Sequence, residues 1–511
     1  MGAAINKEMV DHALYAEAKE LDASDTNRSN VKFSYLSQKI ATALLDPSNM
    51  PTLESLEAQY ETQATAWKSG EKPPFCVVEG VKYAIDATKF AAIEEPGHVC
   101  VCVPFYCEFE RGCAATAENP NGEESPVQKI DELLFLLNYN TRITCELVFI
   151  NDSIAEKKDE KDGGSALLFK TSLLAYCKER ELAVETTGDA ANFDALVVAG
   201  KNLTITFTSV GAEAAKGGAA ETPEAKTKRL ENRHPETNKL QERKGGAVLA
   251  GMERALPAGV DPTRAIRCLV DGDSAHPIGS FVGDAAYAVL QLGHAAYLGN
   301  LKAPHTCVSV VGADAGGGDA GTQARVANRK LFFSGFIVPF LFPELTGKYK
   351  YTGTTQLPVK AFRGDVDFAA AALPTVQPNV DLGMLALLVT TLNDKGGTID
   401  SGPVTIRDNI ASSTMTTSDL SAEWTKTYGP IFTSAVGLAR NLKPKDFADL
   451  PTWLVTFIEG MELKHYTTLF GDTSTPEVDA FFAKMKDFRG ADDRGAVLAE
   501  LEGLLGKIAF A

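Results

Sequence analysis

Two aspartates separated by one glycine, Asp271-Gly272-Asp273, form the segment with the clearest chemical potential in this sequence. They directly follow Ala265–Val270 (AIRCLV), whose composition predicts a buried β-strand. Ligands of open α/β sheets bind beyond the carboxyl ends of the strands, and paired carboxylates suit Mg²⁺ or Mn²⁺ that bridges a diphosphate. The segment therefore predicts a metal site. A surface turn is the alternative, because Asp-Gly is a common turn dipeptide.

A second segment, Arg243–Ala247 (RKGGA), could bind an anion. It opens a helix predicted over Ala247–Leu256. Its two glycines would let the backbone approach a phosphate closely, and its two cations add positive charge. A flexible helix start is an equally good interpretation, because the segment matches neither the Walker A nor the dinucleotide-binding pattern.

Polar residues also follow two further predicted strands. His98–Phe105 (HVCVCVPF) is followed by Tyr106–Glu108, and Glu146–Ile150 (ELVFI) is followed by Asn151 and Asp152. An acidic side chain at such a strand end can accept a hydrogen bond from a base or a ribose. For Asn151 or Asp152 taken alone, an ordinary turn is the better explanation.

The elements that must position these residues alternate along the chain. Helices are predicted at Ser125–Asn138 and Ser165–Tyr176, and further strands at Leu203–Ser209 and Cys307–Val311. This alternation indicates βαβ units and a parallel sheet. Polar or glycine-rich stretches predict surface loops at residues 156–164, 211–243 and 312–322. Helical patterns dominate residues 1–90 and 418–511.

The composition is that of a soluble globular protein. The 511 residues carry a net charge of −17, and 44% of them are hydrophobic. An acidic chain is poorly suited to nucleic acid or to an anionic membrane surface. Met1–Glu20 lacks an apolar signal core and no run of 18 apolar residues occurs, so we expect a cytoplasmic protein without a transmembrane segment. Leu331–Leu345 is interpreted as a buried core helix, with an amphipathic surface element as the alternative.

The nine cysteines indicate a reducing compartment. Their number is odd, none lie at zinc-type spacing, and several fall in apolar runs where a free thiol behaves as a small hydrophobic side chain. We therefore expect no disulfide framework.

The order of these segments resembles that of the GT-A family 2 glycosyltransferases, in particular the dolichyl-phosphate sugar synthase branch. The chain runs strand-Pro-x-Tyr-x-Glu, strand-Asn-Asp-Ser, Lys-Gly-Gly-Ala and strand-Asp-x-Asp. The family runs strand-Pro-x-Tyr-Asn-Glu, strand-Asp-Asp-Gly-Ser, Lys-Gly-Gly-Ala and Asp-Ala-Asp. Downstream, Thr354–Arg363, Val380–Leu385 and Gly402–Ile406 resemble three later segments of that branch. The resemblance covers about residues 96–415.

This resemblance implies an α/β protein with the GT-A fold, which is Rossmann-like with a mostly parallel central sheet flanked by helices. It divides the chain into a helical N-terminal extension (1–95), a nucleotide-sugar-binding catalytic domain (96–415) and a helical C-terminal extension (416–511). The implied activity is hexosyl transfer from a UDP- or GDP-linked sugar to an unidentified acceptor, with Mn²⁺ or Mg²⁺.

The family's roles fall on particular positions of this chain. The residues near the nucleotide-sugar would be Pro104, Tyr106, Glu108, Asp152, Lys244, Gly245, Asp271, Arg325 and Arg329. Those bordering the acceptor would be Gln356 and Lys360. The metal would be held by Asp271 and Asp273, with Asp408 as a further contact. The candidates for a general base are Asp365, Asp367 and Asp381.

Three departures from the family pattern support an alternative function. The family's acidic residues are replaced by Asn151, Thr354 and Gly383. A catalytically degenerate GT-A scaffold, binding a partner or oligomerising through its helical extensions, would need none of them, whereas the intact Asp-Gly-Asp segment favours an enzyme. A nucleotidyltransferase is disfavoured, because an acidic and aromatic segment (PFYCEFE) follows the first strand in place of a basic, glycine-rich loop.

Overall fold

The computed structural model divides into two compact units. The α/β unit comprises Met1–Gly312, Pro358–Asp367 and Thr398–Ser412, and the helical unit comprises the remaining residues. The residues described are 11–23, 30–48, 50–69, 73–105, 112–113, 122, 124–151, 160–188, 193–209, 244–272, 277–300, 305–306, 328–329, 331–346, 348–349, 359–368, 380–395, 397–407, 420–471, 474–489 and 493–510.

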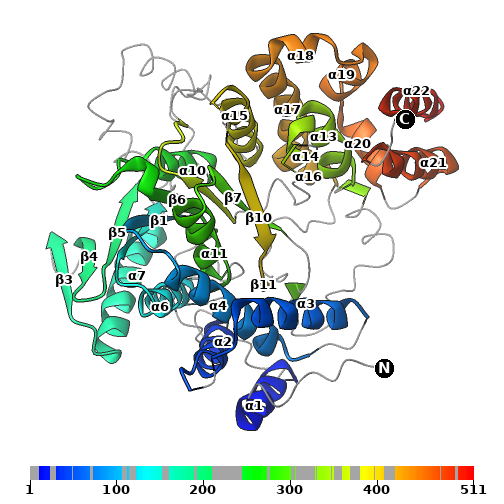
Figure 1. Cartoon of the computed structure of the whole chain (residues 1–511). Helices are drawn as coiled ribbons and strands as arrows, with labels where there is room; N and C mark the ends of the chain where they lie inside the picture. Colours follow the sequence, from blue (N-terminus) through cyan, green and yellow to red (C-terminus); the bar gives the residue numbers. More distant parts are fainter. Residues whose placement is uncertain are drawn as a thin grey trace. The chain divides into compact units, whose positions relative to one another are not determined.

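A nine-stranded mixed sheet forms the centre of the α/β unit (Figure 1). Its strands are β1 (Gly97–Phe105), β2 (Ile143–Asn151), β3 (Val184–Gly188), β4 (Phe193–Val198), β5 (Leu203–Ser209), β6 (Ala265–Leu269), β7 (Ala296–Asn300), β9 (Lys360–Arg363) and β10 (Ile399–Pro403). They lie in the order β10-β7-β9-β6-β1-β2-β5-β4-β3. The four central strands β6, β1, β2 and β5 are mutually parallel, whereas β9 runs antiparallel to both of its neighbours. Two short strands, β8 (His305–Thr306) and β11 (Ile406–Arg407), pair separately.

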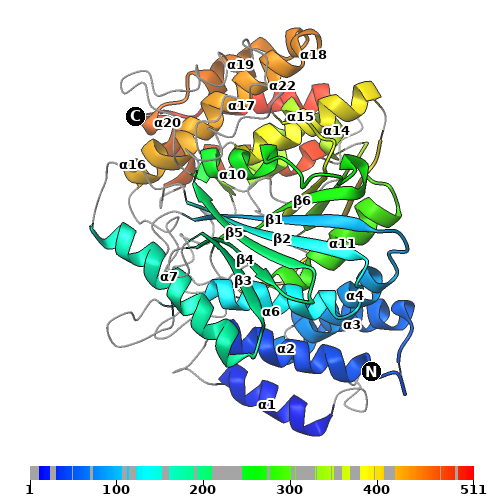
Figure 2. The ribbon, with the colours of Figure 1, turned by 90° about the vertical axis from the view of Figure 1, so that its left-hand side faces the viewer.

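The two faces of the central sheet differ in chemistry, because side chains alternate along a strand. Val99, Val101 and Val103 of β1 point to one face and are fully buried. His98 and Cys100 point to the other face, in register with Thr144 and Glu146 of β2. Figure 2 shows helices on both sides, with α6 (Ser125–Leu137) and α10 (Lys244–Glu253) on opposite faces. We call these sides the α6 face and the α10 face.

The N-terminal helices are part of the α/β unit. They are α1 (His12–Ala23), α2 (Asn30–Leu44), α3 (Leu53–Ser69) and α4 (Phe75–Ala91). Nearly every side chain of α4 is buried, and α4 packs against α2, α3 and α11 (Val282–Ala286). The division therefore differs from the sequence-based expectation of a separate extension at residues 1–95, because the apolar surface of α4 is buried on all sides.

A buried ionic cluster joins α4 to α11. Lys82 contacts Asp86 and, at 2.5 Å, Asp284, while Lys89 lies 2.9 Å from Asp284. Tyr297 donates a further hydrogen bond to Asp284 at 3.0 Å. Burial alone would raise the pKa of Asp284, but the two lysines outweigh it and lower this pKa to about 2. The cluster therefore holds α4 against α11 through lysine and aspartate charges that compensate one another.

The helical unit is built around aromatic side chains. Its helices are η4 (Leu331–Ile337, a π-helix), α13 (Val338–Leu341), α14 (Pro343–Thr346), α15 (Val380–Lys395), α16 (Leu420–Glu423), η8 (Trp424–Tyr428, a π-helix), α17 (Gly429–Leu442), α18 (Pro444–Ala448), α19 (Thr452–Glu459), α20 (Leu463–Phe470), α21 (Pro476–Met485), η9 (Lys486–Arg489) and α22 (Arg494–Leu505). Phe332 packs edge to face on Phe432 and Phe470, with ring centroids 5.5 and 5.6 Å apart. The interpretation of Leu331–Leu345 as core is thus confirmed, although the segment comprises several short helical pieces.

Most elements expected near the sheet are confirmed. The exception within the described residues is 160–164, expected in a loop but found at the start of α7 (Glu160–Glu179). The expected strand at Cys307–Val311 and the loops at 211–243 and 312–322 lie outside the described residues. The seven described cysteines are buried, and none of them forms a disulfide bond with another described residue. None of the helices in the described ranges has the length and apolarity needed to cross a membrane.

Candidate functional site

The parallel strands end together at one edge of the sheet. Phe105 of β1 is in register with Asn151 of β2, which is in register with Ser209 of β5. On the other side of β1, the N–H of Val270 donates to the carbonyl of Cys102 at 3.1 Å. Asp271 follows at once, so it leaves the sheet at the same edge. We call this the carboxyl edge, and it is where open α/β sheets bind ligands.

Helix α6 holds the Asp271-Gly272 turn. The Ser125 hydroxyl, at the first residue of α6, donates a 2.7 Å hydrogen bond to the carbonyl oxygen of Gly272. Ser125 is fully buried, so this bond has little competition from water. Burial and repulsion by Glu179 raise the pKa of the neighbouring Glu124. The turn that carries the predicted metal ligands is therefore attached to a rigid helix.

The same helix holds the far side of this turn. Gly279, in the short 3₁₀-helix η2 (Ile278–Ser280), donates its N–H to Glu132 Oε2 at 3.0 Å. The other oxygen, Oε1, accepts from Ser34 at 2.5 Å, Tyr83 at 2.7 Å and Gln128 at 2.9 Å. Glu132 is fully buried with four donors. Helix α6 thus fixes the chain on both sides of residues 273–276.

The predicted anion-binding segment begins α10, whose axis runs back from the carboxyl edge. A Cβ atom at Gly251 would lie 2.8 Å from Cys102 Cβ and Ile150 Cδ1, so α10 rests directly on β1 and β2. Arg254, after the helix, bonds Glu146 further back along β2 at 2.9 Å. The helix start therefore points toward the carboxyl edge, and the first N–H groups of a helix, which have no intrahelical acceptor, favour anions. Gly245 is buried there, and only the backbone of Lys244 is described.

The antiparallel strand β9 separates two groups of predicted residues. Lys360 is fully buried and in register with Leu269, so it lies at the carboxyl edge near Asp271. Asp365 and Asp367 follow the other end of β9 and lie at the opposite edge, where Asp365 forms an exposed ion pair with Arg363 at 2.7 Å. The structure therefore brings Lys360 toward Asp271 but takes these two candidate bases away from it.

Two predicted residues belong to the helical unit. Arg329 is buried, with its guanidinium 5.1 Å from the Tyr428 ring and 3.2 Å from the Tyr466 hydroxyl. Asp381 is buried in the first turn of α15. Arg329 is thus part of the aromatic packing of the helical unit.

Of the remaining predicted residues, the structure describes only Pro104. Pro104 is buried in β1, opposite Ile150. Outside the described residues lie Tyr106, Glu108, Asp152, Asp273, Arg325, Gln356 and Asp408. Within the described ranges, no three His, Cys, Asp or Glu side chains group closely enough to hold a metal ion.

The sequence analysis missed the residues that position the edge. Ser125 and Glu132 contact segments more than 140 residues away, and no local pattern marks such a contact. It also missed His98 and Glu146, which alternate with apolar residues in strands read as uniformly buried. That alternation was the available signal for a polar face.

Comparison with known proteins adds no family assignment. No model of a protein family matches this chain, and no curated protein is detectably similar to it in sequence. The chemistry of the site must therefore be argued from its own residues.

Proposed function

We propose that this protein is a metal-dependent glycosyltransferase with a GT-A fold, which transfers a hexose from a nucleoside diphosphate sugar. The observation that carries the proposal is the convergence at the carboxyl edge. The Asp271-Gly272 turn, the start of α10 and the buried Lys360 all meet the ends of the parallel strands there. These are three features that a diphosphate and its metal ion would use.

The sheet topology supports the fold assignment. Strands β2 and β5 follow β1 on one side of it in the sheet, whereas the later strand β6 lies on the other side of β1. This reversal is the switch point of doubly wound sheets, where nucleotides bind. Beyond β6 the antiparallel β9 interrupts the parallel order. On the other side, β4 runs antiparallel to β3 and β5, so four of the eight neighbouring strand pairs of this sheet are parallel and four are antiparallel. The parallel centre is the part of the sheet that supports the proposal of a GT-A fold.

The described residues have distinct tasks in this proposal. The backbone N–H groups at the start of α10 would bind donor phosphate oxygens, and Lys360 would add positive charge at the same edge. Ser125 would act as a positioning residue, because its bond to Gly272 sets where the Asp271 side chain leaves the sheet. Asp365 and Asp367 have no role in this arrangement, because they lie at the opposite edge.

The residues of the turn fit a divalent cation. Asp271 is half-buried at the carboxyl edge, a setting in which a carboxylate can bind a hard cation that keeps some of its water. Asp271 and Asp273 would hold Mn²⁺ or Mg²⁺. When bound, such an ion offsets the charge that grows on a departing nucleoside diphosphate.

The test is binding and turnover with a panel of UDP- and GDP-sugars plus Mn²⁺, measured as thermal stabilisation and as slow donor hydrolysis. At least one donor should stabilise the protein, and Asp271→Ala should abolish the effect. Asp273→Asn should lower turnover at least ~100-fold, the range for losing a major electrostatic stabiliser. Asp365→Ala is the matched control, because it removes an aspartate from the opposite edge, and it should behave as the wild type.

Two outcomes would contradict the proposal. A protein that responds to none of the nucleotides or metals cannot be this enzyme, and the α/β unit would then be a scaffold. A donor response that survives in Asp271→Ala but is lost in Asp365→Ala would place the site at the other edge of the sheet.

A further inference from the structure

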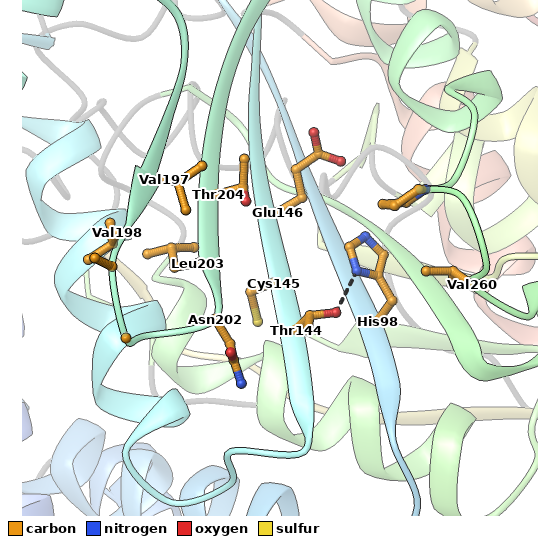
Figure 3. A pocket seen from close by; sticks show the side chains of 13 residues that line it. His98, Thr144, Cys145, Glu146, Val197, Val198, Asn202, Leu203, Thr204 and Val260 are labelled. Atoms are coloured by element: carbon orange, nitrogen blue, oxygen red, sulfur yellow. Dashed lines mark hydrogen bonds between the residues drawn. The ribbon is translucent and has the colours of Figure 1, made fainter. Parts of the chain in front are cut away.

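A cavity of about 580 Å³ opens on the α10 face, toward the amino ends of β1 and β2 (Figure 3). Its volume falls in the range of roughly 300–1,000 Å³ typical of small-molecule sites. Its apolar side chains on this face are those of Val197, Pro257 and Val260, because Val198 and Leu203, which also line it, are in register with Cys145 and point their side chains to the α6 face. Polar residues of β1, β2 and β5 form the rest, namely His98, Thr144, Glu146, Asn202 and Thr204.

His98 lines this cavity and has a buried ring nitrogen. It is only 5% exposed, and its Nε2 is buried without a hydrogen-bond partner among the described residues. Its Nδ1 lies 2.9 Å from the hydroxyl of Thr144, which itself donates to the carbonyl of Gly97 at 3.4 Å. Because the Gly97 carbonyl is available as the acceptor of the Thr144 hydroxyl, we assign the ring proton to Nδ1, as a donor to Thr144, and the lone pair to Nε2. Burial lowers the pKa of His98, partly opposed by Glu146, which favours this neutral form.

Glu146 and Arg254 compensate each other beside the cavity, while a further cation that acts on His98, Arg267, donates to the carbonyl oxygens of Gly364 and Arg254 at 2.7 and 3.1 Å. Glu146 Oε1 accepts from Arg254 at 2.9 Å and from Thr206 at 2.8 Å. The pair therefore leaves little net charge to attract an ion, and a charged ligand would lose its hydration without a counter-charge. An uncharged ligand meets no such penalty.

We propose that this cavity is a second ligand site, for an uncharged aromatic or heteroaromatic molecule that donates one N–H or O–H hydrogen bond to His98 Nε2. The apolar walls would cover the body of the ligand, and the histidine would select the donor. An unsatisfied buried acceptor is unfavourable, and such a ligand would satisfy it.

This site is distinct from the carboxyl edge. His98 is the second residue of β1 and Phe105 is the last, and seven residues of strand span about 23 Å at ~3.3 Å per residue. The inference therefore does not depend on the proposed sugar transfer. Either could fail without the other.

The test uses indole and 1-methylindole, which share an apolar body but differ in the N–H donor. Both are titrated into the full-length protein and followed by saturation-transfer difference NMR. Indole should bind saturably, and 1-methylindole should bind at least about tenfold more weakly, because it leaves the acceptor unsatisfied. In His98→Phe this preference should disappear.

A second variant keeps the test independent of His98. Val197 is 37% exposed at the cavity wall, so Val197→Trp can fill the cavity without disturbing the core and should abolish indole binding. Met50→Trp places the same side chain at a different exposed position and should leave binding unchanged. The proposal is overturned if indole does not bind saturably, if both indoles bind equally, or if Val197→Trp binds indole as the wild type does.

Discussion

Two buried polar clusters lie on opposite sides of the same sheet, and they differ in how completely their groups are satisfied. On the α6 side, Glu132 accepts from three side chains and one backbone N–H, and no part of it is exposed. On the α10 face, Glu146 is paired with Arg254, but the neighbouring His98, which lines a cavity, has a buried Nε2 without a hydrogen-bond partner among the described residues.

This difference separates a structural role from a binding role. A saturated carboxylate has no remaining capacity for a ligand, so Glu132 can only hold α2, α4, α6 and η2 together. A buried nitrogen without a partner beside a cavity retains such a capacity. Burial of a polar group is therefore a poor guide to function, whereas its hydrogen-bond count is informative.

The largest expected effect comes from breaking the saturated cluster. Glu132→Ala leaves four buried donors without their acceptor, and we expect it to lower the free energy of unfolding by about 3–5 kcal/mol. Urea unfolding followed by far-UV circular dichroism measures this. Glu132→Gln, which keeps part of the acceptor, should lose less. A loss below about 1 kcal/mol for the alanine variant would refute the structural role.

An intermediate effect is expected on the α10 face. Arg254→Met removes the partner of Glu146 but keeps apolar contact, and we expect a loss of about 2 kcal/mol. Thr206→Val, which removes the other donor to the same oxygen, should cost about 1 kcal/mol. Equal losses in Arg254→Met and Glu132→Ala, in the same unfolding assay, would erase the distinction between the clusters.

A small effect on stability is expected at His98 itself. His98→Phe loses one hydrogen bond but places a ring of similar shape beside apolar walls, so the change should be about 1 kcal/mol or less. The unfolding midpoint in urea checks this. A loss as large as that of Glu132→Ala would show that His98 is structural, contrary to its assignment as a ligand acceptor.

The smallest effect is a pH dependence. Burial lowers the pKa of His98 below its ordinary 6.5 in the folded protein, so below that pH the unfolded chain binds a proton that the folded protein does not. His98 therefore lowers stability as the pH falls below 6.5 and has no such effect above it. Unfolding free energies measured across this range should fall more steeply for the wild type than for His98→Phe. Parallel profiles would contradict the assignment.

Much of the fold could be predicted from the sequence, because the signals are local. Runs of apolar residues marked β1, β2 and β6, and the apolar stripe of Ser125–Asn138 marked α6. The position of Asp271 at a carboxyl edge followed from its place after a parallel strand. The direction of β9 did not follow, because antiparallel pairing depends on the path of the whole chain.

The N-terminal helices also show that local sequence patterns do not reveal tertiary contacts. Their helical pattern was evident, but the pattern does not say what covers α4. The Lys82–Asp284 contact joins residues 202 positions apart, and it holds α4 against α11 within the α/β unit.

The sequence by itself determined where strands and helices form and which of their ends carry polar residues, since hydrophobic periodicity and chain order are properties of neighbouring residues. Only the tertiary structure decided which polar groups meet. It placed Asp365 and Asp367 at the opposite edge from Asp271, gave Glu132 four donors and left His98 Nε2 beside a cavity. The physical reason is that the hydrogen-bond partners of a buried polar group come from segments far apart in the chain. No local sequence pattern records which segments those are.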